Sequence, residues 1–222
     1  MAKPSDLLEN YANYAVHVRL ATASNYVENL NTRPNPKAKK LFMVRLIDEM
    51  LAQVEDYALW LDAVRHRNQR TRGANDVWQH VLMQHNSYRT LRLLGKNCNN
   101  TQLLRKLRLP SVPRIAELMN LDIEDARAMV TLLSKIVEYA YVNAEENDQM
   151  LSQFHNKIKH GMMVIETNDG IDIVTSKLGK DDTIEKRHMS VRTDIVAAQT
   201  YYDNMESAAQ AIRFLVRLLA KI

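Results

Sequence analysis

Apolar side chains recur every three or four positions along most of this chain, which is the spacing of an amphipathic helix. Pro34 and Pro36 interrupt the pattern once, Gly95 ends a later run, and Pro110 and Pro113 are expected to stop a short basic helix. Residues 143–148 form the weakest part of the longest run, where a break is expected. The pattern predicts helices over residues 5–31, 41–72, 75–94, 101–109, 115–120, 122–160 and 194–221.

The period changes only between the last two predicted helices. Met162–Glu166 and Ile171–Thr175 are extended in pattern and flank Asn168-Asp169-Gly170, which is a strong turn sequence. These residues predict a β-hairpin. A further extended piece is expected from Thr183 to Met189.

Composition supports the same fold class. The 222 residues contain only 5 Gly and 5 Pro, whereas average usage would supply roughly 12% of the two together. Sandwiches, barrels and propellers need these residues at every turn, so the scarcity argues against them. We therefore expect a mainly α multi-helix bundle with long helices and a small β-hairpin before the C-terminal helix. The whole chain, 1–222, is predicted to be a single helical domain, with a subdivision into 1–96 and 97–222 as the alternative.

Several classes of site are excluded by the residues that the chain lacks. Its single cysteine, Cys98, cannot form a disulfide framework or a cysteine-based metal site. Glycine-rich phosphate loops, nucleophile elbows and His-Glu-x-x-His zinc motifs are absent from the sequence. No apolar run reaches the roughly 18 residues of a membrane span. We expect a cytoplasmic protein that has no metal, no cofactor and no membrane partner.

The net charge of +4 is unevenly distributed along the chain. Leu61–Met119 holds eleven Lys and Arg against three acids, or +8, whereas Asn120–Gln153 holds two against seven, or −5. Such segregation can create a basic face for a polyanion. It can equally create two segments that attract each other within the fold or across a dimer.

Clustered Lys and Arg in the basic segment are the residue types that bind phosphates. The alternative interpretation is a solvated helix end, or a surface that pairs with the acidic segment. The candidate phosphate or nucleic-acid contacts in this segment are Arg65, Arg67, Arg70, Arg72, Arg105, Lys106 and Arg108.

The residue pattern of Ser111–Arg127 resembles that of bacterial helix-turn-helix regulators. A recognition helix would direct its first turns at DNA, and here those turns carry Asp122, Glu124 and Asp125. Three carboxylates would repel the phosphates, whereas acids at a helix N-terminus favourably oppose the helix dipole. The sequence therefore favours a capped helix, and a DNA-binding regulator is kept as a third hypothesis.

The segment Phe154–Gly161 resembles the motif region of HEPN-type helical proteins, many of which carry Arg-polar-x-x-x-His late in a bundle helix. The resemblance implies a metal-independent ribonuclease that works as a dimer. His160 matches the catalytic histidine and Asn156 the polar position, while His155 replaces the arginine. Lys157 and Lys159 could hold a phosphate as point charges. The alternative is helix termination, because cations and Gly161 suit a helix C-terminus.

These observations lead to two main functional hypotheses. The first is a nucleic-acid-associated HEPN-like protein, either RNA-binding or a degenerate metal-independent ribonuclease, with RNA as its partner and a homodimer as its form. The second is a non-catalytic helical interaction module that acts as a homodimer or with a protein partner. Steep salt dependence of RNA affinity would favour the first.

Overall fold

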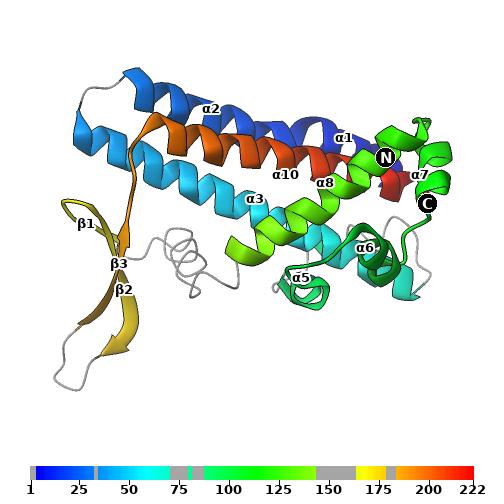
Figure 1. Cartoon of the computed structure of the whole chain (residues 1–222). Coiled ribbons are helices and arrows are strands. Elements are labelled where there is room, and N and C mark those ends of the chain that lie inside the picture. Colours follow the sequence, from blue (N-terminus) through cyan, green and yellow to red (C-terminus); the bar gives the residue numbers. More distant parts are fainter. Residues whose placement is uncertain (1–3, 33–34, 71–79, 82–87, 144–163, 179–183) are drawn as a thin grey trace.

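The computed structural model describes residues 4–32, 35–70, 80–81, 88–143, 164–178 and 184–222. These residues form a mainly α multi-helix structure with one small sheet before the last helix, which confirms the predicted class (Figure 1). The helices are α1 (Pro4–Asn10), the π-helix η1 (Tyr11–Ala15), α2 (Val16–Thr32), α3 (Pro36–Arg70), α5 (Tyr88–Leu94), α6 (Asn100–Leu107), α7 (Val112–Met119), α8 (Ile123–Tyr141) and α10 (Ile195–Lys221).

The helices α2, α3 and α10 pack side by side and form the body of the molecule (Figure 1). Tyr57 and Trp60 of α3 are fully or almost fully buried between neighbouring helices, as are Ile212 and Leu215 of α10. The helix α8 crosses this layer obliquely, and the hydroxyl of Tyr57 donates a 2.7 Å hydrogen bond to the carbonyl of Leu133 in α8. A continuous core therefore joins helices from both halves of the sequence.

The first predicted helix contains a π turn that its periodicity did not indicate. α1 and α2 run into each other through η1, and two arginines of α10 bind this turn. Arg213 Nε donates to the carbonyl of Ala12 at 3.2 Å, and Arg217 donates to the side chain of Asn13 at 2.8 Å. The turn is thus held by contacts with a helix 200 residues away in sequence, which local spacing cannot report.

Helix starts in the structure follow the capping residues. Asn99 forms a capping box with Gln102 at the start of α6, and Asp122 accepts a 2.7 Å hydrogen bond from the backbone of Asp125 in α8. The helix α7 begins at Val112 rather than at the predicted Ile115. The reason is that proline is tolerated in a first turn, where its missing N–H has no partner to lose, so Pro113 starts this helix instead of stopping one.

Two predicted helices are described only in part. Of the helix predicted over 75–94, residues 80–81 and 88–94 are helical and the remainder lies outside the described residues. Of the helix predicted over 122–160, the structure describes α8 to Tyr141 and a short π segment to residue 143. The helix α3 starts earlier than predicted, at Pro36, with the Asn35 side chain accepting a 2.9 Å hydrogen bond from the backbone of Lys37.

The sheet is a three-stranded antiparallel meander in the order β1-β2-β3. β1 (Val164–Glu166) and β2 (Gly170–Leu178) are the predicted hairpin, and β3 (Ile184–Ser190) is the further extended piece. Ile171 of β2 pairs with Met189 of β3 and is buried against the helices. Lys40 of α3 donates to the carbonyls of Thr167 and Asn168 and so fixes the first turn of the sheet to the helical body.

Candidate nucleic-acid interface

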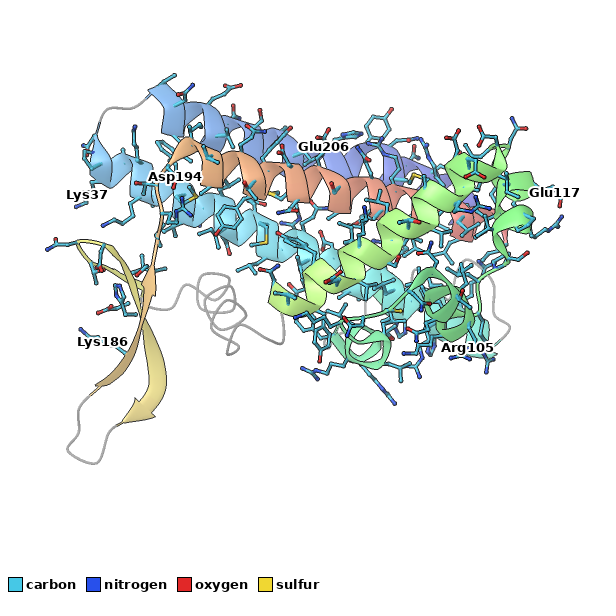
Figure 2. The ribbon with its side chains drawn as sticks, in the orientation of Figure 1. Lys37, Arg105, Glu117, Lys186, Asp194 and Glu206 are labelled. Atoms are coloured by element: carbon cyan, nitrogen blue, oxygen red, sulfur yellow. The ribbon has the colours of Figure 1, made fainter. Side chains whose placement is uncertain are left out.

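The basic segment of the sequence becomes a surface on α5, α6 and the loop between them. From Tyr88 to Ala116 the chain carries seven Lys or Arg and no Asp or Glu. Figure 2 shows nitrogen-tipped side chains gathered at this end of the molecule, where Arg105 is labelled. We define the basic face by its exposed or half-buried cations Arg89, Arg92, Lys96, Arg105 and Arg108.

Local backbone geometry sets how the basic face is presented. Gly95 has a φ of 76°, in the left-handed region that glycine adopts without strain, and it closes α5. Arg108 closes α6 with a φ of 53°, and its N–H donates to the carbonyls of Leu104 and Arg105. The two short helices end in tight left-handed turns, so their arginines stand on well-defined elements.

Two predicted contacts of the basic segment are used inside the fold. Lys106 Nζ donates to the carbonyls of Leu93 and Leu94 at 3.0 and 3.1 Å, at the C-terminal end of α5. Arg67 donates to the carbonyl of Leu219 near the end of α10 at 2.7 Å, and burial lowers the pKa of its guanidinium. Both cations bind the carbonyls that a helix C-terminus leaves without partners. They stabilise the scaffold below the basic face and are not part of it.

The remaining candidates fall into two groups. Arg105 and Arg108 are exposed on the basic face, and Arg65 is half-buried on α3. Arg70 ends α3, and only its backbone is described. The candidate residues that lie outside the described residues are Arg72, His155, Asn156, Lys157, Lys159 and His160.

A buried polar cluster beneath α5 was not predicted from the sequence. Asp62 of α3 accepts from His80 Nε2 at 2.8 Å and from the hydroxyl of Thr90 in α5, and only 7% of the Asp62 surface is exposed. The ring of His66 stacks on that of His80 with centroids 4.2 Å apart and planes at 20°. The signal in the sequence was Asp62 inside an otherwise apolar run, with His66 one turn later.

This cluster joins three separate stretches of chain at the base of the basic face. A buried carboxylate is costly unless its oxygens are hydrogen-bonded, and Asp62 has a bond on each oxygen. Thr90 lies next to Arg89, so the bond from Thr90 to Asp62 fixes α5 where its arginines begin. Within the described part of the chain, no group of three His, Cys, Asp or Glu is arranged to hold a metal ion.

Two side-chain hydrogen bonds between α6 and α8 are made by neutral groups. Asn100 donates to Thr131 at 2.8 Å and accepts from Ser134 at 2.5 Å. The acidic first turn of α8 bonds within itself, because Arg127 contacts both oxygens of Glu124 at 2.6 and 2.7 Å. Glu124 is therefore paired with a cation of its own helix.

The helix-turn-helix region carries exposed acids where a reading helix would meet DNA. α7 and α8 are joined by a turn at Asn120, whose φ is 54°. Asp122, Glu124 and Asp125 are all exposed at the start of α8, and Asp122 caps the helix. The geometry is that of the capped helix, and the acidic surface is unfavourable for phosphates.

None of the helices in the described part of the chain combines the length and the apolar character that crossing a bilayer requires. Comparison of the chain with protein-family models, with curated proteins and with solved structures finds no match. The basic face, with the Asp62 cluster below it, is therefore the candidate site that the chain's own residues define.

Proposed function

We propose that this protein binds RNA through the basic face. The observation that carries the proposal is the set of exposed arginines on α5 and α6 within a segment that contains no carboxylate. Phosphate neutralisation by Lys and Arg supplies most of the affinity of non-specific nucleic-acid binding, because it releases condensed counterions. No carboxylate lies between these cations in the sequence, so the segment itself adds no charge that repels a polyanion.

The geometry favours a flexible single strand over duplex DNA. The cations of the basic face are spread over more than one element: Arg89 and Arg92 lie on α5, and Arg105 lies on α6. The helices α7 and α8, whose sequence resembles a helix-turn-helix, present carboxylates at the start of α8. Cations on α5, on α6 and on the loop between them suit a backbone that can bend to reach them, as single-stranded RNA does.

The resemblance to HEPN-type proteins adds a separate prediction of RNA cleavage. Its residues, His155, Asn156 and His160, lie outside the described residues, so the proposal of binding does not depend on them. Metal-free incubation with RNA, comparing the wild type with His160→Ala, tests cleavage by itself. Equal background rates in the two proteins would remove the nuclease hypothesis and leave RNA binding unaffected.

Binding is tested by fluorescence anisotropy with a labelled single-stranded RNA across a salt series. For single strands, the slope of log affinity against log salt is about −0.7 per neutralised phosphate. We expect Arg89→Gln/Arg105→Gln to weaken binding and to reduce the slope by about 1.4, if each arginine neutralises one phosphate.

The matched control removes two cations from the opposite end of the molecule. Lys37→Gln/Arg45→Gln changes the net charge by the same amount, and Lys37 lies far from Arg105 (Figure 2). Both side chains are exposed on α3. Equal losses of slope in the two double variants would show that the basic face has no special role, and no RNA binding at low salt would contradict the proposal.

A further inference from the structure

The outer surface of α10 carries a stripe of polar residues in which the sign of charge reverses. Asp203, Glu206, Gln210, Arg213 and Arg217 follow one another at intervals of three and four residues, so they share one face of the helix. Four of them are exposed and Arg213 is half-buried. Both acids precede Gln210 and both bases follow it, so the stripe has no net charge but is strongly bipolar.

The neighbouring helix presents an uncharged stripe with the same spacing. Tyr14 of η1 and Val18, Ala21 and Asn25 of α2 are exposed at intervals of four, three and four residues. Tyr14 is 71% exposed and Val18 is 65% exposed. Two exposed apolar side chains one turn apart therefore lie beside the bipolar stripe, so this side of the molecule offers both apolar and charged groups to a partner.

The two stripes border a common groove. α2 and α10 pack against each other, and a hollow of about 440 Å³ lies between them. Ala21 and Ala209 line it with small side chains, and Glu206, Gln210 and Arg213 form its α10 wall. The hollow leaves room for side chains of a partner between the two stripes.

The positive end of the α10 stripe is fixed in place. Arg213 Nε donates to the carbonyl of Ala12 at 3.2 Å, and a terminal nitrogen of the same guanidinium contacts His17. Arg217 donates to the side chain of Asn13 at 2.8 Å. Both guanidinium groups are thus oriented by η1 and α2 before any partner binds, which reduces the entropy lost on association.

We propose that a second copy of this chain docks on the α2–α10 face, antiparallel and related by a two-fold axis near Gln210. Asp203 lies seven residues before Gln210 and Arg217 lies seven after it. A two-fold axis there places Asp203 opposite the partner's Arg217 and Glu206 opposite the partner's Arg213. An interface of this kind is isologous, because the same patch serves on both copies.

Charge complementarity selects this occupant. In a parallel arrangement the acids of one copy would meet the acids of the other, which is unfavourable, whereas the antiparallel one joins opposite charges at both ends. A polyanion gains nothing from a stripe of two acids and two bases. The α2–α10 face is also separate from the basic face, since α2 lies on the opposite side of α3 from α5 and α6 (Figure 1).

A charge swap tests this arrangement. We expect the wild-type chain to sediment as a dimer at micromolar concentration, and we expect Asp203→Arg or Arg217→Asp alone to raise the dissociation constant about tenfold or more, because like charges then meet at both ends. The double variant Asp203→Arg/Arg217→Asp recreates both pairs in reverse and should recover the dimer. Circular dichroism of each variant establishes that it is folded.

The outcomes are decisive in each case. A monomeric wild type, single variants that dimerise as well as the wild type, or a folded double variant that stays monomeric would each overturn the proposal. Recovery of the dimer in the double variant supports it, because a merely destabilising substitution would not be rescued by a second one.

Cross-linking at the proposed axis gives a second measurement. Gln210→Cys places two thiols near each other across the two-fold axis, and a short bis-maleimide should join them into a covalent dimer. Cys98 is buried and burial raises the pKa of its thiol, so it reacts slowly. Lys135→Cys on α8 is the exposed control and should not cross-link; equal yields at the two positions would contradict the axis.

Discussion

The basic face and the α2–α10 face use charge in opposite ways. The first collects cations of one sign over α5, α6 and their loop, with no acid between Tyr88 and Ala116. The second reverses sign once along one helix, with acids before Gln210 and bases after it. A field of one sign attracts any polyanion at long range, whereas a bipolar stripe cancels at long range and acts only on a surface with matching geometry.

A count of cations in a segment therefore does not identify a binding surface. Arg67 and Lys106 belong to the most basic part of the sequence, but each binds carbonyls at a helix end. Arg213 and Arg217 lie in a part of the chain with little net charge, and both bind η1, through the carbonyl of Ala12 and the side chain of Asn13. Arg213 also lines the groove between α2 and α10, and Arg217 is exposed, so the contacts and the exposure of a cation identify its role together.

The largest effect is expected from the cluster beneath the basic face. Asp62→Ala leaves His80 and Thr90 without their carboxylate in a buried site, which should lower the free energy of unfolding by about 3 kcal/mol. Urea denaturation measures the change. Because the bond from Thr90 fixes α5, we also expect the folded Asp62→Ala variant to bind RNA more weakly than the wild type does.

The control for this variant is Glu138→Ala, which removes an exposed carboxylate from α8 and should change stability by less than about 0.5 kcal/mol. A loss for Asp62→Ala no larger than that of the control would show that the cluster does not hold α5 in place. Dimerisation on the α2–α10 face should persist in Asp62→Ala as long as the body of the molecule is folded.

An intermediate effect separates the two kinds of cation in the basic segment. Lys106→Met removes hydrogen bonds to two carbonyls of α5 and should cost about 1 kcal/mol of stability, with little change in the salt slope of RNA binding. Arg105→Gln should reduce the salt slope and change stability little, since Arg105 is exposed. Thermal unfolding and the anisotropy salt series, measured on both variants, provide the comparison. If Lys106→Met reduced the magnitude of the salt slope more than Arg105→Gln does, Lys106 would not belong to the scaffold.

The smallest effect is expected on the sheet, which lies away from both faces. Asp172 contacts His188 Nδ1 at 2.9 Å and, with Asp169, raises the pKa of that imidazole. The pair therefore contributes stability below the ordinary histidine pKa of about 6.5 and loses it as pH rises through the raised value. Asp172→Asn should lower the pKa of His188, as measured by NMR titration of the imidazole.

The same variant is a negative control for both faces. Asp172→Asn should leave both RNA affinity and dimerisation unchanged, because neither face includes the sheet. An unchanged pKa for His188 would contradict the contact itself, and a change in RNA affinity would mean that the sheet belongs to the binding surface.

Most of the fold was accessible to sequence reasoning because it depends on local patterns. The spacing of apolar residues located the long helices, Asp122 marked the start of α8, and Asn168-Asp169-Gly170 marked the turn between β1 and β2. The start of α7 was misplaced because Pro113 can begin a helix as well as prevent one.

The sites were less accessible because they depend on contacts between distant residues. The Asp62 cluster assembles residues from three stretches of chain, and the π turn at Tyr11–Ala15 is bound by Arg213 and Arg217. Arg89 and Arg92 were part of the basic run, but only their exposure on α5 identified them as members of a surface. Periodicity reports which side of a helix is buried and does not report what covers it.

Sedimentation velocity of the full chain with a fluorescent single-stranded RNA at low salt tests whether RNA binding and dimerisation use separate faces. We expect the wild type to carry RNA in a complex of two chains, and we expect Arg89→Gln/Arg105→Gln to remain a two-chain species with reduced RNA. We expect Asp203→Arg to carry RNA as a single chain. Loss of both RNA and the second chain in either folded variant would contradict the separation, because it would show that one surface performs both roles.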